Sequence, residues 1–395
     1  MGRSNNSIRD AVQPIEKISA ESVPPNARCY VEISRSAIAA NYRAVRDAVG
    51  PDTGVIGVVK ADAYGHGAIE VSRILCNEGV EWLAVSSVDE GVALRRAGIG
   101  RRILVMAGVM PWECGAIAEY SLTPVAHSLE ELKALNERCA SGIRVHLKID
   151  TGMNRLGTRA RAEEIAAAAA AAPNVKIEGL MSHFASAADF TSDQTEYQIG
   201  LFDEMKRFLA TEGLFPAVLH FASTNAVAYP RRDAWLSLVR TGHAIYGYVS
   251  PPRGHAPAPA LRVKPALEWR ARIVLVKDVP AGARIGYGGG FVAQAPMRIA
   301  VLSAGYADGV PHRLSSRGKV IAGGKFAPIV GPVSMDLTTI DITGSPKLSP
   351  GDPVTLLGRE GDVYLDAQQI ARTAGTISYN VLCGISARVK RIYVE

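Results

Sequence analysis

The chain has 395 residues, of which 48% are hydrophobic and 21% are charged. This is the composition of a globular protein of two or three domains, and it excludes disordered and fibrous chains. No run of about 18–20 uncharged apolar residues is present, which excludes a membrane-spanning helix. The formal net charge of +6 comes from scattered basic residues. Such a charge suits anionic small molecules at least as well as nucleic acid, and no nucleic-acid-binding module is recognisable.

The N-terminal residues 1–27 are polar and lack the apolar core of a signal peptide. They end near Pro24-Pro25 and predict a poorly ordered extension. The cysteines form no CxxC pair, which argues against a disulfide framework or a zinc site and favours a reducing compartment. These cysteines are Cys29, Cys76, Cys114, Cys139 and Cys383. Together these features predict a cytoplasmic protein without a metal site.

Residues 28–262 alternate short apolar runs with stretches that can be helical. A first strand near residues 29–34 can pack with the C-terminal domain. One apolar helical stripe follows it, formed by Ile38, Tyr42, Val45 and Val49. Eight strand-like runs come next, at residues 55–59, 82–85, 102–106, 122–126, 144–149, 177–182, 217–221 and 236–239. Apolar strands that alternate with helices indicate parallel βαβ units, and eight units over about 200–250 residues predict a closed barrel.

Two of the predicted helices carry a start signal. Ser87 precedes Glu90 by three positions, and Ser128 precedes Glu131 by the same spacing. In such a capping box the hydroxyl and the carboxylate satisfy each other's unpaired backbone N–H groups. The pattern predicts a helix start at each serine.

Residues 251–260, PPRGHAPAPA, form a turn and linker cluster, after which the pattern changes. The later residues read as strands separated by glycine and proline, mostly without helices between them. The Gly-rich stretch 286–290 is interpreted as a turn between strands rather than a phosphate-binding loop, and Tyr287 within it is left unassigned. The predicted fold is α/β: a (β/α)8 TIM-type barrel over residues 28–262, followed by a mainly β C-terminal domain over residues 263–395.

The carboxyl ends of the predicted barrel strands carry mostly cationic side chains. In a barrel of this class the reacting groups come from these strand ends. The residues there are Lys60, Lys148, Asp150, Arg155, His183, His220, Ser223, Thr224, Arg240, Gly242 and His243. Converging Lys, Arg and His side chains favour an anionic ligand, with phosphate and carboxylate as the best candidates.

Lys60 is the most informative of these residues, because it directly follows an apolar strand and precedes ADAYGHG. A lysine at the mouth of a barrel is partly desolvated, which lowers its pKa and frees an amine for Schiff-base chemistry. Gly65 and Gly67 allow backbone N–H groups to approach a ligand, and Tyr64 can hydrogen-bond a phosphate. From these residues alone, a lysine held in an ion pair remains an alternative.

The stretch VVKADAYGHG (58–67) resembles the pyridoxal-phosphate lysine motif of the alanine racemases. Six more stretches resemble further motifs of that family in the same order: KIDTGMNRLG (148–157), LMSHFA (180–185), VRTGHAIYG (239–247), GYADG (305–309), VGPVSMD (330–336) and ISYNVLCGISARV (377–389). The resemblance covers residues 28–395, that is, both predicted domains. It implies an isomerase that interconverts L- and D-alanine with pyridoxal 5'-phosphate (PLP) and supplies D-alanine for peptidoglycan. The family's fold, a barrel followed by a β domain, agrees with the one predicted above.

The resemblance implies two catalytic bases. Lys60 would hold the cofactor covalently and act on one face of the substrate α-carbon, and Tyr306 would act on the other face. In the family this tyrosine reaches the site from the partner subunit, which implies a head-to-tail homodimer. Inversion needs bases on opposite faces, because one base favours return of the proton to the same face.

The resemblance also assigns the cofactor's ring and phosphate. Arg240 would hydrogen-bond the pyridine nitrogen, and His183 would brace Arg240. A permanent cation keeps this nitrogen unprotonated, which weakens the ring as an electron sink and favours simple return of the proton. The phosphate would be held by Tyr64, Thr224, Tyr379 and the backbone N–H groups of Gly242 and His243.

Two further assignments concern the substrate. Arg155 would hold its carboxylate together with the Met335 backbone N–H. Lys148 matches a lysine that is carbamylated in many relatives and positions that arginine; an ion pair between Lys148 and Asp150 is the alternative. Supporting hydrogen bonds are expected from three residues near motif centres, His66, His220 and Asp336.

Three other functions are alternatives to this one. A serine or broader-specificity racemase shares every residue named above and differs only in pocket shape, where one methylene is worth about 1–3 kcal/mol. Barrel decarboxylases of amino acids use a similar lysine but complete their site with a different C-terminal motif. Non-enzymatic PLP carriers are single barrels without a β domain.

Overall fold

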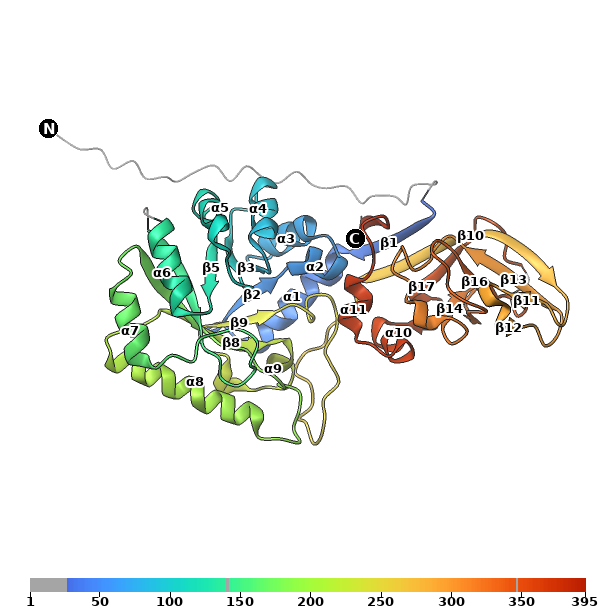
Figure 1. Ribbon diagram of the computed structural model, residues 1–395. Coiled ribbons are helices and arrows are strands. Elements are labelled where there is room, and N and C mark those ends of the chain that lie inside the picture. The colour runs from blue at the N-terminus through green and yellow to red at the C-terminus, as the bar shows by residue number, and fades with distance from the viewer. Residues whose placement is uncertain (1–26, 140–141, 346) are drawn as a thin grey trace.

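The computed structural model describes residues 27–139, 142–345 and 347–395 (Figure 1). The predicted extension over residues 1–27 lies outside the described residues, apart from Ala27. The chain forms a helix-rich barrel at one end and a β-rich part at the other (Figure 1). Within the described ranges, no helix has the length and apolar character needed to cross a membrane.

The helix-rich part is a closed barrel of eight parallel strands. They are β2 (Gly54–Val58), β3 (Trp82–Val85), β4 (Arg102–Val105), β5 (Thr123–Ala126), β6 (Ile143–Lys148), β7 (Val175–Met181), β8 (Val218–Ser223) and β9 (Leu238–Thr241). The barrel closes where β9 pairs with β2, with Arg240 opposite Ile56. The predicted (β/α)8 barrel is confirmed, and each predicted strand end lies within two residues of the observed one.

Helices follow most barrel strands, and the longer ones cover the outside of the barrel (Figure 1). They are α1 (Arg35–Val49), α2 (Lys60–Gly65), α3 (Ala68–Asn77), α4 (Val88–Arg96), α5 (Cys114–Glu119), α6 (Leu129–Arg138), α7 (Ala162–Ala170), α8 (Gln194–Thr211) and α9 (Thr224–Ala228). The predicted apolar stripe is confirmed in α1, where Ile38, Tyr42, Val45 and Val49 are all buried. Their spacing of three and four residues gives the helix one face toward the core.

The capping box that starts α4 is confirmed. The Ser87 Oγ accepts from the Glu90 N–H at 3.3 Å, and Glu90 Oε2 accepts from the Ser87 N–H at 3.3 Å. The box predicted at Ser128 is only half right. Ser128 Oγ accepts from the Glu131 N–H at 3.1 Å, but the Glu131 carboxylate accepts from the His127 N–H at 2.6 Å. The carboxylate therefore caps the residue before the predicted one.

The second part is mainly β, as predicted. The main path of its nine-stranded sheet runs β15-β14-β17-β10-β1-β19, with β13, β16 and β18 attached to it. The strands are β1 (Cys29–Ser34), β10 (Leu267–Val279), β13 (Met297–Leu302), β14 (Lys319–Ala322), β15 (Lys325–Pro328), β16 (Thr338–Asp341), β17 (Pro353–Glu360), β18 (Val363–Leu365) and β19 (Lys390–Val394). N-terminal β1 pairs antiparallel with β10 and parallel with β19, so both ends of the described chain contribute to one sheet.

The connections in this part agree with the sequence reading. The Gly-rich stretch 286–290 is a turn between the short strands β11 (Arg284–Ile285) and β12 (Phe291–Val292). Tyr287 in this turn is 81% exposed. The predicted domain boundary after residue 262 falls in the irregular segment between β9 and β10 and stays a prediction.

Two helices of the C-terminal part, α10 (Ala367–Ala374) and α11 (Ser378–Cys383), return the chain to the barrel. Helix α11 lies so close to α2 that a Cβ atom on Gly65 would stand only 2.5 Å from the Leu382 carbonyl oxygen. The backbone of α11 therefore leaves no room for a side chain at position 65, and only glycine lets the two helices come this close. This contact brings a C-terminal helix to the mouth of the barrel.

Candidate active site

A cavity of about 650 Å³ opens at the carboxyl ends of the barrel strands. The predicted site residues that line it are Lys60, Tyr64, Lys148, Arg155, His183, Thr224, Arg240, Gly242, His243 and Tyr379. Four of the lining side chains are Lys or Arg, and none contributed by the described residues is Asp or Glu. A cavity with this charge suits an anionic ligand.

Lys60 stands directly after β2 at the wall of this cavity. Burial is the main cause of the lowered pKa of its amine, and the positive charge of Arg155 lowers it further. A lowered pKa enlarges the neutral fraction of the amine, which is the form that attacks an aldehyde. In the described part of the chain Lys60 forms no ion pair, so the ion-pair interpretation is not supported.

The turn that follows Lys60 is left-handed. The φ angles of Ala61, Asp62, Ala63 and Tyr64 lie between 51° and 55°. For residues other than glycine this conformation is less favourable than a right-handed turn by about 1–2 kcal/mol each. Hydrogen bonds hold it in place: Glu90 Oε1 accepts from the Ala61 N–H at 2.6 Å, and Asp62 Oδ1 accepts from the Ala68 N–H at 2.7 Å. Backbone strain of this kind clusters at functional sites.

Arg240 is held by five hydrogen bonds. Its Nη1 donates to Nδ1 and the carbonyl oxygen of His220, at 2.8 and 2.9 Å. Its Nη2 donates to His183 Nδ1 at 3.0 Å and to the carbonyl oxygens of Ser182 and Phe221, at 2.7 and 3.0 Å. The guanidinium is thus fixed in position. Burial lowers the pKa of Arg240 to about 9, which leaves it a cation at neutral pH.

The two histidines that contact Arg240 are neutral. Burial, and then the charge of Arg240, lower the pKa of both His183 and His220 well below the ordinary value. Because Nδ1 of each ring accepts from a guanidinium, each ring carries its proton on Nε2. His220 Nε2 lies 2.7 Å from Nδ1 of His146, which extends the row of bonds into the barrel core. His220 therefore has the supporting role expected of it.

Hydroxyl groups gather at another side of the cavity. Tyr64 and Tyr379 have ring centroids 6.0 Å apart, and Thr224 Oγ1 accepts from the Ala244 N–H at 3.3 Å. Burial raises the pKa of both tyrosines, so both stay protonated and can donate. A Cβ atom on Gly242 would stand 2.4 Å from the Tyr64 hydroxyl oxygen, so only glycine leaves this space open.

The His243 ring packs against Tyr379 and contacts Ser378. It stacks on Tyr379 with centroids 3.8 Å apart, and its Nε2 lies 3.2 Å from Ser378 Oγ. Burial lowers the pKa of His243 to about 3, so the ring is neutral. The imidazole is therefore packed against α11 and affects the shape of the cavity through Tyr379.

Lys148, at the end of β6, has no ion-pair partner among the described residues, and the alternative ion pair with Asp150 is wrong. Asp150 binds Arg159 at 3.0 Å instead and accepts from the N–H groups of Gly152 and Asn154. These bonds turn the Asp150 carboxylate toward its own loop. Burial and the charges of Arg240 and Arg155 lower the pKa of Lys148 to about 8.

Arg155 lies in the loop after β6, is exposed, and makes no hydrogen bond or ion pair within the described ranges. Its guanidinium is therefore available to a ligand in the cavity it lines.

Tyr306 and Met335 do not line the cavity of their own chain. They lie on neighbouring loops of the β-rich part, where they are 46% and 54% exposed. The Tyr306 N–H donates to the Ser334 carbonyl oxygen at 2.9 Å, and the Ala307 N–H donates to the Met335 carbonyl oxygen at 2.9 Å. One chain thus presents Lys60 inside a cavity and Tyr306 with Met335 on its surface.

Sequence reasoning missed the role of Glu90. Its capping-box pattern marks Glu90 in the sequence but predicts only a helix cap. The same carboxylate also accepts a hydrogen bond from the Ala61 N–H beside Lys60. Cys383 lines the cavity as well, although its motif was used only to place Tyr379.

Comparison with known proteins agrees with this geometry. Residues 33–251 match the family model "Alanine racemase, N-terminal domain", and residues 266–393 match "Alanine racemase, C-terminal domain". The chain is 39% identical to an alanine racemase of Syntrophobacter fumaroxidans over 363 residues, which cover 91% of this chain and 96% of that protein.

Two solved structures are similar over nearly the full length. An alanine racemase of Bacillus anthracis with bound L-Ala-P has a TM-score of 0.88 and 31% identity, covering 94% of this chain and 96% of that one. An alanine racemase of Bartonella henselae with covalently bound pyridoxal phosphate has a TM-score of 0.82 and 28% identity, covering 93% of this chain and 100% of that one. With the barrel, the β-rich part and the cationic cavity in place, this chain belongs to the alanine racemase family.

Proposed function

We propose that this chain is a PLP-dependent alanine racemase, an isomerase that interconverts L-alanine and D-alanine by proton transfer at the α-carbon. The observation that carries the proposal is the cavity at the barrel mouth. There Lys60, with its lowered pKa, stands with Lys148, Arg155 and Arg240, and no carboxylate of the described residues lines the wall. Membership of the family and the pyridoxal phosphate of the Bartonella protein support the same reaction.

The residues present fit PLP. Lys60 would bind its aldehyde carbon, and the hydroxyls of Tyr64, Tyr379 and Thr224 would bind its phosphate with the backbone N–H groups at Gly242 and His243. The glycine keeps this end of the cavity open, and both tyrosines are protonated donors. When bound, PLP withdraws electron density from the substrate α-carbon and makes its proton acidic.

Arg240 would donate to the pyridine nitrogen. Its five hydrogen bonds leave it no freedom to turn away, and as a cation it cannot accept a proton. Arg240 would thereby keep that nitrogen unprotonated, which would favour return of the proton to the α-carbon over transamination.

Two bases on opposite faces of the α-carbon carry the inversion. Lys60 would remove or return the proton on one face and the Tyr306 phenol on the other. Because Tyr306 is exposed and does not line the cavity of its own chain, the partner subunit would supply it. The protein would therefore act as a head-to-tail homodimer in which each site holds Lys60 of one chain and Tyr306 of the other.

Arg155 and the Met335 N–H would hold the substrate carboxylate. The N–H of Met335 makes no hydrogen bond within the described residues, and Arg155 is likewise free of protein partners. Both groups are thus ready to bind, and the dimer would bring them together.

Carbamylation of Lys148 would place a negative charge among the Lys and Arg side chains of the cavity. A neutral Lys148 amine adds carbon dioxide to give a carbamate anion and releases one proton. Its lowered pKa makes the neutral amine accessible near pH 8, and Arg155 and Arg240 would attract the resulting negative charge. The lack of a carboxylate partner among the described residues supports this modification over a permanent ammonium.

The cysteines support a reducing, cytoplasmic location, since none of Cys29, Cys76, Cys114, Cys139 and Cys383 is in a disulfide. D-Alanine formed there would serve as a peptidoglycan precursor. No observation favours the serine or broader-specificity alternative.

Proton NMR of the PLP-loaded protein with L-alanine in D2O, together with chiral analysis of the product, tests the proposal. We expect the α-proton signal to disappear while D-alanine forms. L-Serine, run in parallel, measures the specificity. A protein that binds PLP but exchanges the α-proton of neither amino acid contradicts the proposal.

A further inference from the structure

The loops that carry Tyr306 and Met335 form one packed unit. Besides the two hydrogen bonds between them, their backbones approach so closely at Gly305 that a Cβ atom there would stand 2.3 Å from the Met335 carbonyl oxygen and 2.4 Å from that of Ser334. Because backbone meets backbone, neither loop can shift without the other. The position of the Tyr306 phenol is therefore set by whatever holds the pair of loops.

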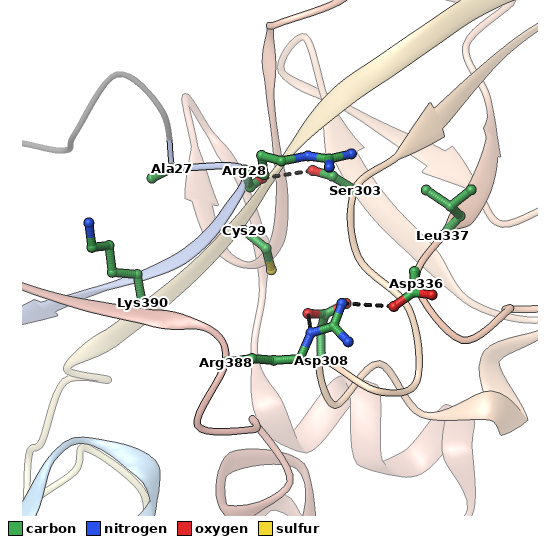
Figure 2. Close-up of a pocket in the computed structure, with 9 residues that line it drawn as sticks. All are labelled: Ala27, Arg28, Cys29, Ser303, Asp308, Asp336, Leu337, Arg388 and Lys390. Carbon is green, nitrogen blue, oxygen red and sulfur yellow. Dashed lines mark hydrogen bonds and ion pairs between the residues drawn. The ribbon is translucent and has the colours of Figure 1, made fainter.

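The guanidinium of Arg388 contacts both of these loops. Arg388 Nε lies 2.9 Å from Asp308 Oδ1, and Arg388 Nη2 lies 2.8 Å from Asp336 Oδ1 (Figure 2). Asp308 is two residues after Tyr306, and Asp336 follows Met335 directly. The second oxygen of Asp308 accepts from the Gly305 N–H at 2.8 Å, so this carboxylate also closes the Tyr306 loop on itself.

The two ion pairs differ in their surroundings. The Asp308 side chain is 5% exposed, whereas that of Asp336 is 56% exposed. An exposed pair contributes little, but a buried carboxylate that loses its counter-charge is left uncompensated. The Asp308 contact is therefore the main one of the two.

Hydrogen bonds hold the segment that carries Arg388, residues 385–391, in place. The Ser386 N–H donates to the Asp308 carbonyl oxygen at 3.1 Å, so a backbone hydrogen bond joins the same two segments as the Arg388–Asp308 ion pair. Nearby, Arg391 donates to the carbonyl oxygens of Ile385, at 2.8 Å, and of Gly65, at 3.2 Å. The latter bond ties the segment to α2, which begins at Lys60. Arg388 thus reaches the Tyr306 loop from a segment anchored on the barrel.

We propose that Arg388 is a positioning residue that holds the Tyr306 phenol and the Met335 N–H at the site they complete on the partner subunit. The inference rests on the proposed function, because it takes Tyr306 as the second base. A planar guanidinium can bind two carboxylates at fixed angles, whereas a lysine ammonium is a single point of charge. Arg388 itself touches neither substrate nor cofactor in this role.

The test separates proton exchange from inversion. The full-length, PLP-loaded Arg388→Ala variant is given each alanine enantiomer in D2O, and loss of the α-proton and inversion are measured in the same sample. Misplacement of a reacting group by about 1 Å lowers a rate by as much as ~100-fold. We expect inversion to fall at least about 10-fold. Exchange without inversion should persist for the enantiomer that Lys60 deprotonates, with the visible absorption of the lysine-bound cofactor unchanged.

Control variants keep the test decisive. Lys390→Ala changes an exposed side chain of the same segment that points away from the two carboxylates (Figure 2), and it should behave as wild type. Arg388→Lys, which can keep the Asp308 contact, should recover part of the inversion rate. If Arg388→Ala does not fold, Arg388→Lys and Asp336→Asn undergo the same measurement and should show a smaller rise of exchange over inversion.

Two results overturn the inference: wild-type inversion in Arg388→Ala, or an equal fall of exchange for both enantiomers. A parallel Tyr306→Phe variant separates this failure from that of the proposed function. If Tyr306→Phe racemises normally, Tyr306 is not the base. If it blocks inversion while Arg388→Ala does not, only the positioning role fails.

Discussion

The Glu90 carboxylate accepts a hydrogen bond from the Ala61 N–H over 2.6 Å and joins the start of α4 to the left-handed turn after Lys60. Its other oxygen accepts from the N–H groups of Ser86 and Ser87, at 2.6 and 3.3 Å. One carboxylate thus caps a helix and holds strained backbone beside the amine that would bind the cofactor. The cap and the turn are coupled, because both use the same side chain.

Removing this carboxylate should weaken both features. Loss of a helix cap destabilises by about 0.5–2 kcal/mol, and release of the left-handed turn adds to it. We expect Glu90→Ala to lower the free energy of unfolding by about 2 kcal/mol and to weaken PLP attachment, seen as a reduced visible absorption band at limiting PLP.

Glu131→Ala is a matched control, because Glu131 accepts from the His127 N–H at 2.6 Å at the start of α6 but does not contact the Lys60 turn. It should lower stability by a similar amount and leave PLP attachment unchanged. Equal PLP attachment in the two variants would contradict the coupling between cap and turn.

Lys148→Gln should impair substrate binding more than turnover. Without the proposed carbamate, the charge that would orient Arg155 is lost, so KM for alanine should rise about 10-fold while kcat changes little. Added bicarbonate should stimulate the wild type and not the variant. Because the pKa of Lys148 is about 8, the neutral amine and hence the stimulation should increase as pH rises from 7 to 9. The modification is contradicted if the intact mass of the wild type never includes carbon dioxide and bicarbonate does not change its activity.

Hybrid dimers test the head-to-tail arrangement. Lys60→Ala and Tyr306→Phe should each be inactive alone, for lack of one base. Mixed in equal amounts and allowed to exchange subunits, half the dimers are hybrids with one intact site, so roughly one quarter of wild-type activity should return. The pure variants, passed through the same exchange, serve as controls. A mixture that stays inactive despite measured subunit exchange means that the two bases act within one chain.

Buried neutral histidines make stability depend on pH. Burial lowers the pKa of His66 and His127 to about 4 and that of His146 to about 3. In the unfolded chain these groups bind protons below about pH 6.5, so the stability present above that pH is lost as pH falls toward 4.

Urea unfolding at several pH values measures this loss. Each such histidine contributes a slope of up to about 1.4 kcal/mol per pH unit within the window. His127→Asn should reduce the slope by about one histidine's share. A free energy of unfolding that is constant between pH 6.5 and 4 contradicts the buried neutral state.

The sequence alone was sufficient for the barrel, the β-rich part and ten residues of the cavity. The strands were visible because a closed parallel barrel buries both faces of each strand, which produces uninterrupted apolar runs such as 55–59. Lys60, Lys148 and Arg240 could be placed at the strand ends for the same reason, since the point where each run stops marks the mouth of the barrel.

The partner that each of these polar side chains binds depended on the tertiary structure. Asp150 turned to Arg159 rather than Lys148, Glu90 reached Ala61, and Arg388 bridged Asp308 and Asp336. A side chain's choice of partner depends on its direction and on which competing group is nearer, and neither is encoded in local spacing. Apolar periodicity reports which face is buried, whereas a hydrogen bond forms only where folding has brought two particular atoms to about 3 Å.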